Sequence, residues 1–285
     1  MYCVIKTNNK LGGKIMDILK RKAIEEIVDA SITNFVNGFE LRYTRDLNNP
    51  NGVINQKKNN CFIAELGVEF VFYSAFVRSF DSSFGNVLEN MGNNIARLSY
   101  EVRGTIKSFL LPQQTQAMDY IITEYERHTK PEVKDYSDVH VMIPTDTRSY
   151  MKDHATDNYF FNPDTKEHFI IELKAGGDLD VKKAKAEKIA LLQEYFMLKN
   201  SFLDCPDHTI KLFFGTAYNM YGEGNDWRQE RVKQFFAEEE LLIGKDYWNF
   251  VCNDLEGFNI IFTQYQKSCQ KIRDALYRIK NIYIS

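Results

Sequence analysis

The chain has 285 residues, a formal net charge of −3, and 44% hydrophobic and 26% charged residues. This balance is that of a globular protein and excludes disordered, collagen-like and coiled-coil chains. The charge also excludes a uniformly basic protein that coats nucleic acid, but it allows a local basic cleft, because binding depends on where the charges lie.

The first half of the chain is predicted to be helical. Apolar residues recur at three- and four-residue steps between residues 14 and 38, which predicts a helix that stops at Gly38. The Asn-rich segment 41–60 predicts an exposed loop. Further helices are predicted over residues 61–79, over residues 86–107 after the start signal Asp81-Ser82-Ser83-Phe84-Gly85, and over residues 112–128.

The middle of the chain changes to the two-residue alternation that is typical of strands. Strands are predicted at residues 138–143, 157–161, 168–175 and 211–217, with a turn at 162–165 and a helix at 179–200. After a Gly-rich loop at 221–227, the end of the chain is again predicted to be helical.

No internal repeat or linker stands out, so we predict a single α/β domain over residues 1–285, with a small central mixed sheet flanked by many helices. Its parts would be a helical first half over about 14–130, a catalytic hairpin and sheet over about 138–216, and a recognition loop with C-terminal helices over about 217–285.

The cysteines and the first residues predict a cellular compartment. The five cysteines are widely spaced without a CxxC pair, which is typical of reduced thiols and not of a zinc site. The N-terminal residues have no apolar signal region, and no run of roughly 18 apolar residues occurs. We therefore expect a soluble, cytoplasmic protein without a membrane partner.

The segment 156–178 carries the clearest chemistry. Side chains two residues apart on a strand share a face, so Glu172 and Lys174 project together, and Asp157 on the partner strand is expected across the hairpin from Glu172. Two carboxylates suit Mg²⁺, and the lysine could orient or deprotonate the attacking water and offset negative charge. The alternative is a solvated Glu–Lys pair, but the apolar strand around these charges argues against it.

These three residues resemble the PD-(D/E)xK nuclease signature, which lies on a β-hairpin beside an α/β core. The literal Pro163-Asp164 pair falls in the turn, so we assign the metal-binding role to Asp157 and Glu172. Longer segments are similar to the TdeIII-type family of type II restriction endonucleases: residues 171–200, 213–227 and 241–254, together with Ser83-Phe84-Gly85…Glu89.

The resemblance implies a restriction-endonuclease-like fold and a prokaryotic type II restriction endonuclease. Such an enzyme would hydrolyse double-stranded DNA at a short palindrome, GGNCC by analogy, and leave 5′-phosphates. It would use Mg²⁺, with Mn²⁺ as a substitute, and no nucleotide cofactor. A homodimer is implied because a two-fold symmetric DNA site is matched by a two-fold symmetric protein.

The resemblance also suggests a further acid. Ser83-Phe84-Gly85…Glu89 is similar to an S-x-G-x-x-x-E element that opens a helix in many restriction enzymes, so Glu89 would assist the metal or the water. A solvated helix carboxylate is the alternative role of Glu89, and Glu65 and Glu69 are rival acids.

Two segments are candidates for binding DNA. The basic helix after the hairpin could contact phosphates through Lys182, Lys183, Lys185 and Lys188, or form a solvated face. The loop 219–231 could read bases, because Asn and Gln pair with adenine and Arg pairs with guanine. Its recognition candidates are Asn219, Arg228, Gln229 and Arg231, with ordinary helix-start residues as the alternative.

Other residues are assigned to packing, and other functions stay open. His168 shares the strand face of Glu172, but a packed histidine is preferred to a metal ligand, and Trp248 and Phe250 are predicted to lie in a core helix. The alternative functions are another nuclease with the same signature, for repair or for particular DNA structures, and a catalytically silent module that binds DNA or a partner.

Overall fold

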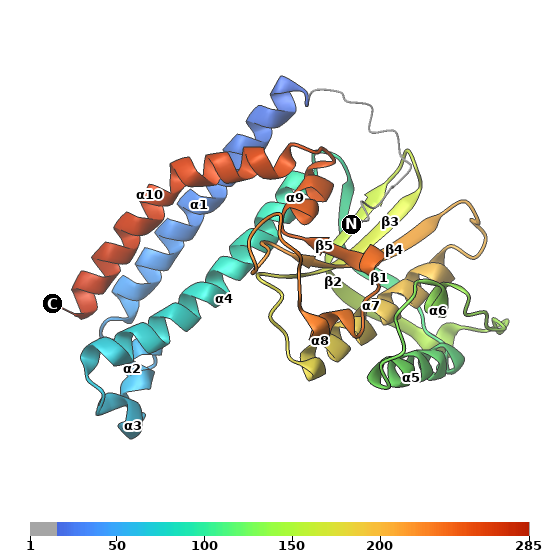
Figure 1. Ribbon diagram of the computed structural model, residues 1–285, viewed down its shortest axis with the longest axis horizontal. Coiled ribbons are helices and arrows are strands. Elements are labelled where there is room, and N and C mark those ends of the chain that lie inside the picture. Colours follow the sequence, from blue (N-terminus) through green and yellow to red (C-terminus); the bar gives the residue numbers. More distant parts are fainter. Residues whose placement is uncertain (1–15, 285) are drawn as a thin grey trace. The chain divides into compact units, whose positions relative to one another are not determined.

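The computed structural model describes residues 16–284, without the side chain of Asp157. These residues divide into two compact units (Figure 1). We call residues 16–95 with 258–284 the helical unit, and residues 96–257 the sheet unit. Whether the two units together form the single domain expected over residues 1–285 stays a prediction.

Three long helices build the helical unit: α1 (Ile18–Asp46), α4 (Val68–Ala96) and α10 (Gly257–Tyr283). The short helices α2 (Val53–Lys58) and α3 (Cys61–Ala64) join α1 to α4. An aromatic seam holds the long helices together, since the Phe76 ring lies 5.6 Å from Phe39 and 5.2 Å from Tyr43, and the Phe72 ring lies 5.8 Å from Tyr283. Ring pairs at such separations add to the free energy of burial.

The predicted helix boundaries in this unit are partly wrong. Helix α1 does not stop at Gly38, because Phe39 and Tyr43 continue its buried face, and the predicted loop 41–60 contains the end of α1 and all of α2. The segment 81–85 lies inside α4 and does not open a helix. Phe80 and Phe84 stack at 5.4 Å and both pack on Phe35, so packing favours one continuous helix.

The sheet unit contains a five-stranded mixed sheet in the order β1-β2-β3-β4-β5. The β1–β2 and β2–β3 pairs are antiparallel, and the β3–β4 and β4–β5 pairs are parallel. The strands are β1 (Glu101–Phe109), β2 (Met151–Asn162), β3 (Glu167–Lys174), β4 (Thr209–Thr216) and β5 (Leu241–Ile243). The helices are α5 (Pro112–Glu126), α6 (Lys134–Ser137), α7 (Val181–Ser201), α8 (Glu230–Lys233) and α9 (Lys245–Cys252), with 3₁₀ turns η1 (Arg148–Tyr150) and η2 (Glu238–Glu240). The predicted α/β class with a small mixed sheet is confirmed.

Pairing and burial explain the differences from the predicted elements. Residues 101–107 of the predicted helix 86–107 belong to strand β1, whose β-branched Val102, Thr105 and Ile106 suit pairing with β2. The predicted strand 138–143 is irregular, and β5 was missed because it has only three residues. Helix α7 links β3 to the parallel strand β4, as a parallel crossover requires.

The core of the sheet unit lies between the sheet and its helices. Ile106, Leu192, Phe196, Leu212 and Phe214 belong to one buried cluster that includes residues of α5 and α7. In α9 the predicted core position of Trp248 is confirmed, because it is 3% exposed and its indole donates to the Ala217 carbonyl at 2.7 Å. Phe250 is half-buried and packs edge-on against Phe169 at 5.0 Å.

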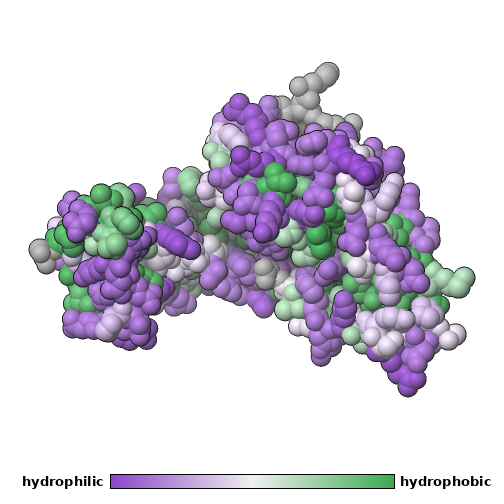
Figure 2. Space-filling model, turned by 90° about the horizontal axis from the view of Figure 1, so that it is seen from below, coloured by the Kyte–Doolittle hydropathy of each residue, from purple (hydrophilic) through white to green (hydrophobic). Residues whose placement is uncertain are grey.

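The visible face of the molecule is mostly hydrophilic, with hydrophobic residues among the polar ones (Figure 2). In the helical unit, Phe62, Leu66 and Phe70 are large apolar residues exposed at the surface of α3 and the start of α4. Among residues 16–284, none of the helices combines the length and the hydropathy that crossing a membrane requires.

Candidate active site

The β2–β3 hairpin positions the candidate site. The predicted turn at 162–165 is present, and the Asn162 side chain accepts from the Asp164 amide at 3.0 Å, which closes it. At the other end, the pairing reaches Asn158 and Ile171, and the next residues on the two strands are Asp157 and Glu172. The backbone therefore brings these two positions to the same end of the hairpin, although the side chain of Asp157 lies outside the described structure.

A bulge marks this end of the hairpin. The β1–β2 register shifts between Arg103 and Thr105, which pair with Tyr159 and Ala155. Three residues of β2, Thr156 to Asn158, therefore face the single residue Gly104 of β1. Bulges re-aim side chains and are frequent next to active sites.

Lys174 lies between two carboxylates at the end of β3. Its ammonium donates to Glu172 on the same strand and lies 3.0 Å from Oε1 of Glu187 on α7. The three side chains are 31%, 15% and 23% exposed for Lys174, Glu172 and Glu187 respectively. Burial alone would lower the pKa of Lys174, but the two carboxylates outweigh burial and hold its pKa above the ordinary value. Lys174 is therefore a cation at neutral pH.

The loop after β3 determines where α7 begins. Gly177 has φ +72°, and a side chain there would meet Thr216 and Trp227, so the backbone needs glycine. Asp180 then caps α7 by accepting from the Lys183 amide at 2.8 Å. The helix starts close to the end of β3, and its second turn brings Glu187 to Lys174.

Glu187 is a candidate site residue that the sequence analysis did not identify, although it forms an ion pair with Lys174. The available signal was topological: a crossover helix that starts directly after the site strand must pass that strand's end with its first turns. Glu194 lies seven residues further on the same helix and is buried at 6% exposure. It accepts from Thr156 at 3.2 Å and lies 3.1 Å from Nδ1 of His154, both on β2.

The donors of this site are of the type that Mg²⁺ prefers. Glu172 and Glu187 both reach the Lys174 ammonium, so their carboxylate oxygens converge on one point, and the position of Asp157 lies beside Glu172. Among the side chains that the structure describes, no three His, Cys, Asp or Glu residues are close enough to hold a metal. The hard oxygen donors fit the ion that the signature implies.

The lysines of α7 have different surroundings. Lys188 is fully buried, with Nζ 2.6 Å and 2.8 Å from the two carboxylate oxygens of Glu240 and 4.9 Å from the Tyr136 ring centre. Burial lowers the pKa of Lys188, and Glu240 opposes that shift. Lys188 therefore cannot contact a phosphate. Lys185 pairs with Glu126 at 2.7 Å. Lys182 and Lys183 are exposed.

The recognition candidates divide into an inner and an outer pair. Asn219 is 8% exposed, donates to the Asn225 carbonyl at 2.8 Å and accepts from the Tyr221 amide at 2.9 Å. Gln229 is also 8% exposed and donates to Asp178 at 2.7 Å. These amides hold the loop, whereas Arg228 and Arg231 are exposed. Base reading by any of the four stays a prediction.

The other predicted residues lie elsewhere in the fold. His168 is fully buried, with Nδ1 2.8 Å from the Tyr159 hydroxyl and Nε2 2.7 Å from His208, which agrees with a packing role. Glu89 and Glu69 lie in α4, and Glu65 follows α3, so all three belong to the helical unit. Their assistance to the metal or the water stays a prediction.

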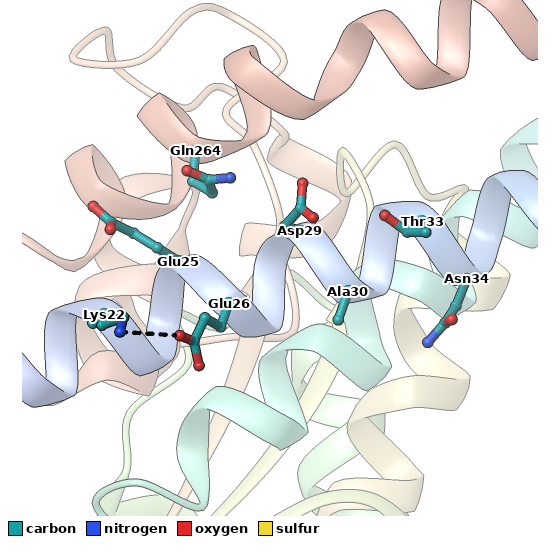
Figure 3. Close-up of a pocket in the computed structure, with 8 residues that line it drawn as sticks. All are labelled: Lys22, Glu25, Glu26, Asp29, Ala30, Thr33, Asn34 and Gln264. Carbon is teal, nitrogen blue, oxygen red and sulfur yellow. Dashed lines mark ion pairs between the residues drawn. The ribbon is translucent and has the colours of Figure 1, made fainter.

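A surface hollow of about 560 Å³ lies between α1 and α10 and contains none of the predicted site residues (Figure 3). Its charged lining is mainly acidic, with Glu25, Glu26 and Asp29, and Lys22 pairs with Glu26 at 3.8 Å. We refer to it below as the acidic hollow.

Comparison with known proteins identifies the family. A family model described as "Type II restriction endonuclease, HinfI" matches residues 20–269, which include most of both units. No curated protein and no solved structure matches the chain. The expected membership in a family of type II restriction endonucleases is confirmed. The family that matches is HinfI, whereas the sequence resemblance was to the TdeIII-type family. The mixed sheet with its helices is consistent with a restriction-endonuclease-like fold. The chain belongs to the HinfI family of type II restriction endonucleases.

Proposed function

We propose that the protein is a Mg²⁺-dependent endonuclease that hydrolyses double-stranded DNA at a short palindrome, with Asp157, Glu172 and Lys174 as its catalytic centre. Membership in a restriction endonuclease family supports DNA cleavage. The observation that carries the assignment of the site is the Lys174 ammonium, held between Glu172 and Glu187 at the end of a hairpin strand.

The geometry favours particular roles for the three residues and for Glu187. Asp157 and Glu172 would hold the ion, with Glu187 as a further oxygen donor or as the group that positions Lys174. When bound, the ion would polarise a phosphoryl oxygen and acidify a water molecule. Lys174, whose ammonium lies between Glu172 and Glu187, would orient or deprotonate the water and offset the charge of the transition state.

The reaction is a hydrolysis that leaves a 5′-phosphate. The water loses a proton as its oxygen bonds to phosphorus, the bond from phosphorus to the 3′ oxygen breaks, and that oxygen takes up a proton to become a 3′-hydroxyl. Lys174 would stabilise the additional negative charge on the phosphoryl oxygens while both bonds are partial.

The proposal also includes the DNA sequence that is cut and the oligomeric state of the enzyme. A palindrome cut in both strands is most simply served by a homodimer, with one hairpin for each strand. The G·C-rich target GGNCC came from the resemblance to the TdeIII-type family. The match to HinfI does not add support for these base pairs, so the target must be read from cleaved ends.

The test is digestion of unmodified phage and plasmid DNA with Mg²⁺, followed by end-sequencing, for the wild type, Lys174→Ala and Lys211→Ala. Lys211 of β4 is a matched control, because it pairs at 2.7 Å with Glu167, which lies at the opposite end of β3 from Lys174. We expect discrete fragments that end at one palindrome for the wild type and Lys211→Ala, and none for Lys174→Ala.

Other outcomes would favour the alternatives. A smear that Lys174→Ala abolishes would favour a nuclease for repair or for particular DNA structures, which competition among linear, nicked and branched DNA would identify. Absence of cleavage by the wild type on many DNAs would favour a silent binding module. A metal titration of the wild type and Lys174→Ala would then measure whether the site still binds the ion.

A further inference from the structure

A second surface hollow, of about 310 Å³, lies between α1, α2 and α4 of the helical unit. The positions of these helices can be followed in Figure 1. We call it the cationic hollow, because its charged lining residues are Arg42, Lys57 and Arg78, accompanied by the polar side chains Gln56, Ser82 and Ser83. A single water needs only roughly 10–15 Å³ of such a space, so the hollow has room for a larger group.

The helices form the hollow through local geometry that the sequence specifies. Arg78 and Ser82 are four residues apart on α4 and therefore share one face of it. Asn55 fixes α2 to the end of α1, since its amide donates to the carbonyls of Asp46 and Leu47 at 3.1 Å and of Asn49 at 2.8 Å. Lys57 is thereby held opposite α4 by the fold.

The charge of this lining is unbalanced. Arg42 forms an ion pair with Asp46, with 4.0 Å between the guanidinium and the carboxylate. Lys57 and Arg78 have no ion-pair partner among residues 16–284, and no acidic side chain lines the hollow. The acidic hollow of the same unit has the opposite character, with three carboxylates and one lysine. A guanidinium and an ammonium beside serine hydroxyls are the donors that proteins use to bind phosphate oxygens.

We propose that the cationic hollow binds a phosphodiester of the DNA substrate and so provides a backbone contact outside the catalytic hairpin. This inference rests on the proposed function, because it takes double-stranded DNA as the ligand. With a net charge of −3 for the whole chain, DNA affinity must come from local groups of cations such as this one. Phosphate contacts of this kind position the protein on the duplex without reading its sequence.

The experiment measures DNA binding at several salt concentrations. The parent protein is Lys174→Ala in Mg²⁺, so that a labelled duplex with the cleaved site stays intact during fluorescence anisotropy. Lys57→Gln and Arg78→Gln are added to it, singly and together. Lys58→Gln is the matched control, because Lys58 is the next residue of α2 and does not line the hollow. Circular dichroism checks that each variant is folded.

The expected result is a weaker salt dependence. Each lost phosphate contact should make the slope of log K against log salt less negative by about 0.9. If affinities converge at 1 M salt, this is about eightfold weaker binding per contact at 0.1 M. Lys58→Gln should keep the slope of the parent, and mismatched duplexes should lose affinity by the same factor, because the contact is independent of sequence.

Three results would overturn the inference. A double variant with the slope and affinity of the parent would exclude the DNA contact while leaving the nuclease proposal intact. Loss of inorganic phosphate binding in calorimetry with unchanged DNA binding would assign the hollow to free phosphate. A parent that binds no DNA, with a wild type that cuts none, would remove the proposed function and this inference with it.

Discussion

Substituting Glu187 by Gln tests whether this residue belongs to the active site. The change removes one of the two carboxylates around Lys174 and keeps the size of the side chain. At the observed 3.0 Å, the Coulomb energy of the pair is roughly 1.4 kcal/mol in water and roughly 5.5 kcal/mol at an effective dielectric constant of 20. Both side chains are partly exposed, so the interaction energy lies in the lower half of this range, and we take about 2 kcal/mol as the energy of the Lys174–Glu187 pair.

This energy predicts a kinetic effect and a small effect on stability. A loss of about 2 kcal/mol in the transition state corresponds to a decrease of kcat by roughly thirtyfold. The free energy of unfolding should change by less than about 1 kcal/mol, because Lys174 keeps its pair with Glu172. Glu187→Asp keeps the charge and should retain more activity than Glu187→Gln.

The assay is single-turnover cleavage of a plasmid with one target site, at saturating enzyme and Mg²⁺. Glu126→Gln is the control, because Glu126 at the end of α5 pairs at 2.7 Å with Lys185, which lies on α7 like Glu187. If Glu187→Gln cleaved as fast as Glu126→Gln, the placement of Glu187 in the active site would be refuted. If both lost activity together with stability, the effect would belong to α7 as a whole.

Three further predictions concern pH, the buried ion pair and the metal. Burial, with smaller effects of His208 and Arg103, lowers the pKa of His168 to about 4. In the unfolded chain the pKa of this histidine is about 6.5, so the unfolded state binds more protons than the folded state below that pH. The free energy of unfolding should therefore fall by about 2 kcal/mol from pH 8 to pH 5. Urea unfolding should show this fall for the wild type and not for His168→Phe. Lys188→Met should cost about 3–5 kcal/mol in the same assay, because it leaves Glu240 buried without its cation, and Lys188→Met with Glu240→Leu should recover most of this loss. EDTA should abolish cleavage, added Mg²⁺ should restore it, and circular dichroism should stay unchanged.

Some features could be predicted because they depend on neighbouring residues. The hairpin with Glu172 and Lys174 follows from alternating β-branched and aromatic residues on either side of an Asn-Pro-Asp-Thr turn. Helix α7 follows from its apolar period and from Asp180, which caps it. These signals lie within one element or one turn, so the sequence is sufficient to locate them.

Other features depend on what each segment packs against. Residues 101–109 form a strand because β2 offers an edge to pair with, and α4 continues through 81–85 because Phe80 and Phe84 meet Phe35. Both segments have weak local preferences for one type of secondary structure, and tertiary contacts outweigh these preferences.

The sequence by itself determined membership in a type II restriction endonuclease family and the position of Glu172 and Lys174 on one strand, since a short motif and a similarity over residues 20–269 need no folding to be recognised. Only the tertiary structure decided that Glu187 meets Lys174 while its neighbour Lys188 is buried against Glu240. Successive residues of a helix point about 100° apart. Which of them faces the site and which faces the core therefore depends on how α7 packs on the sheet.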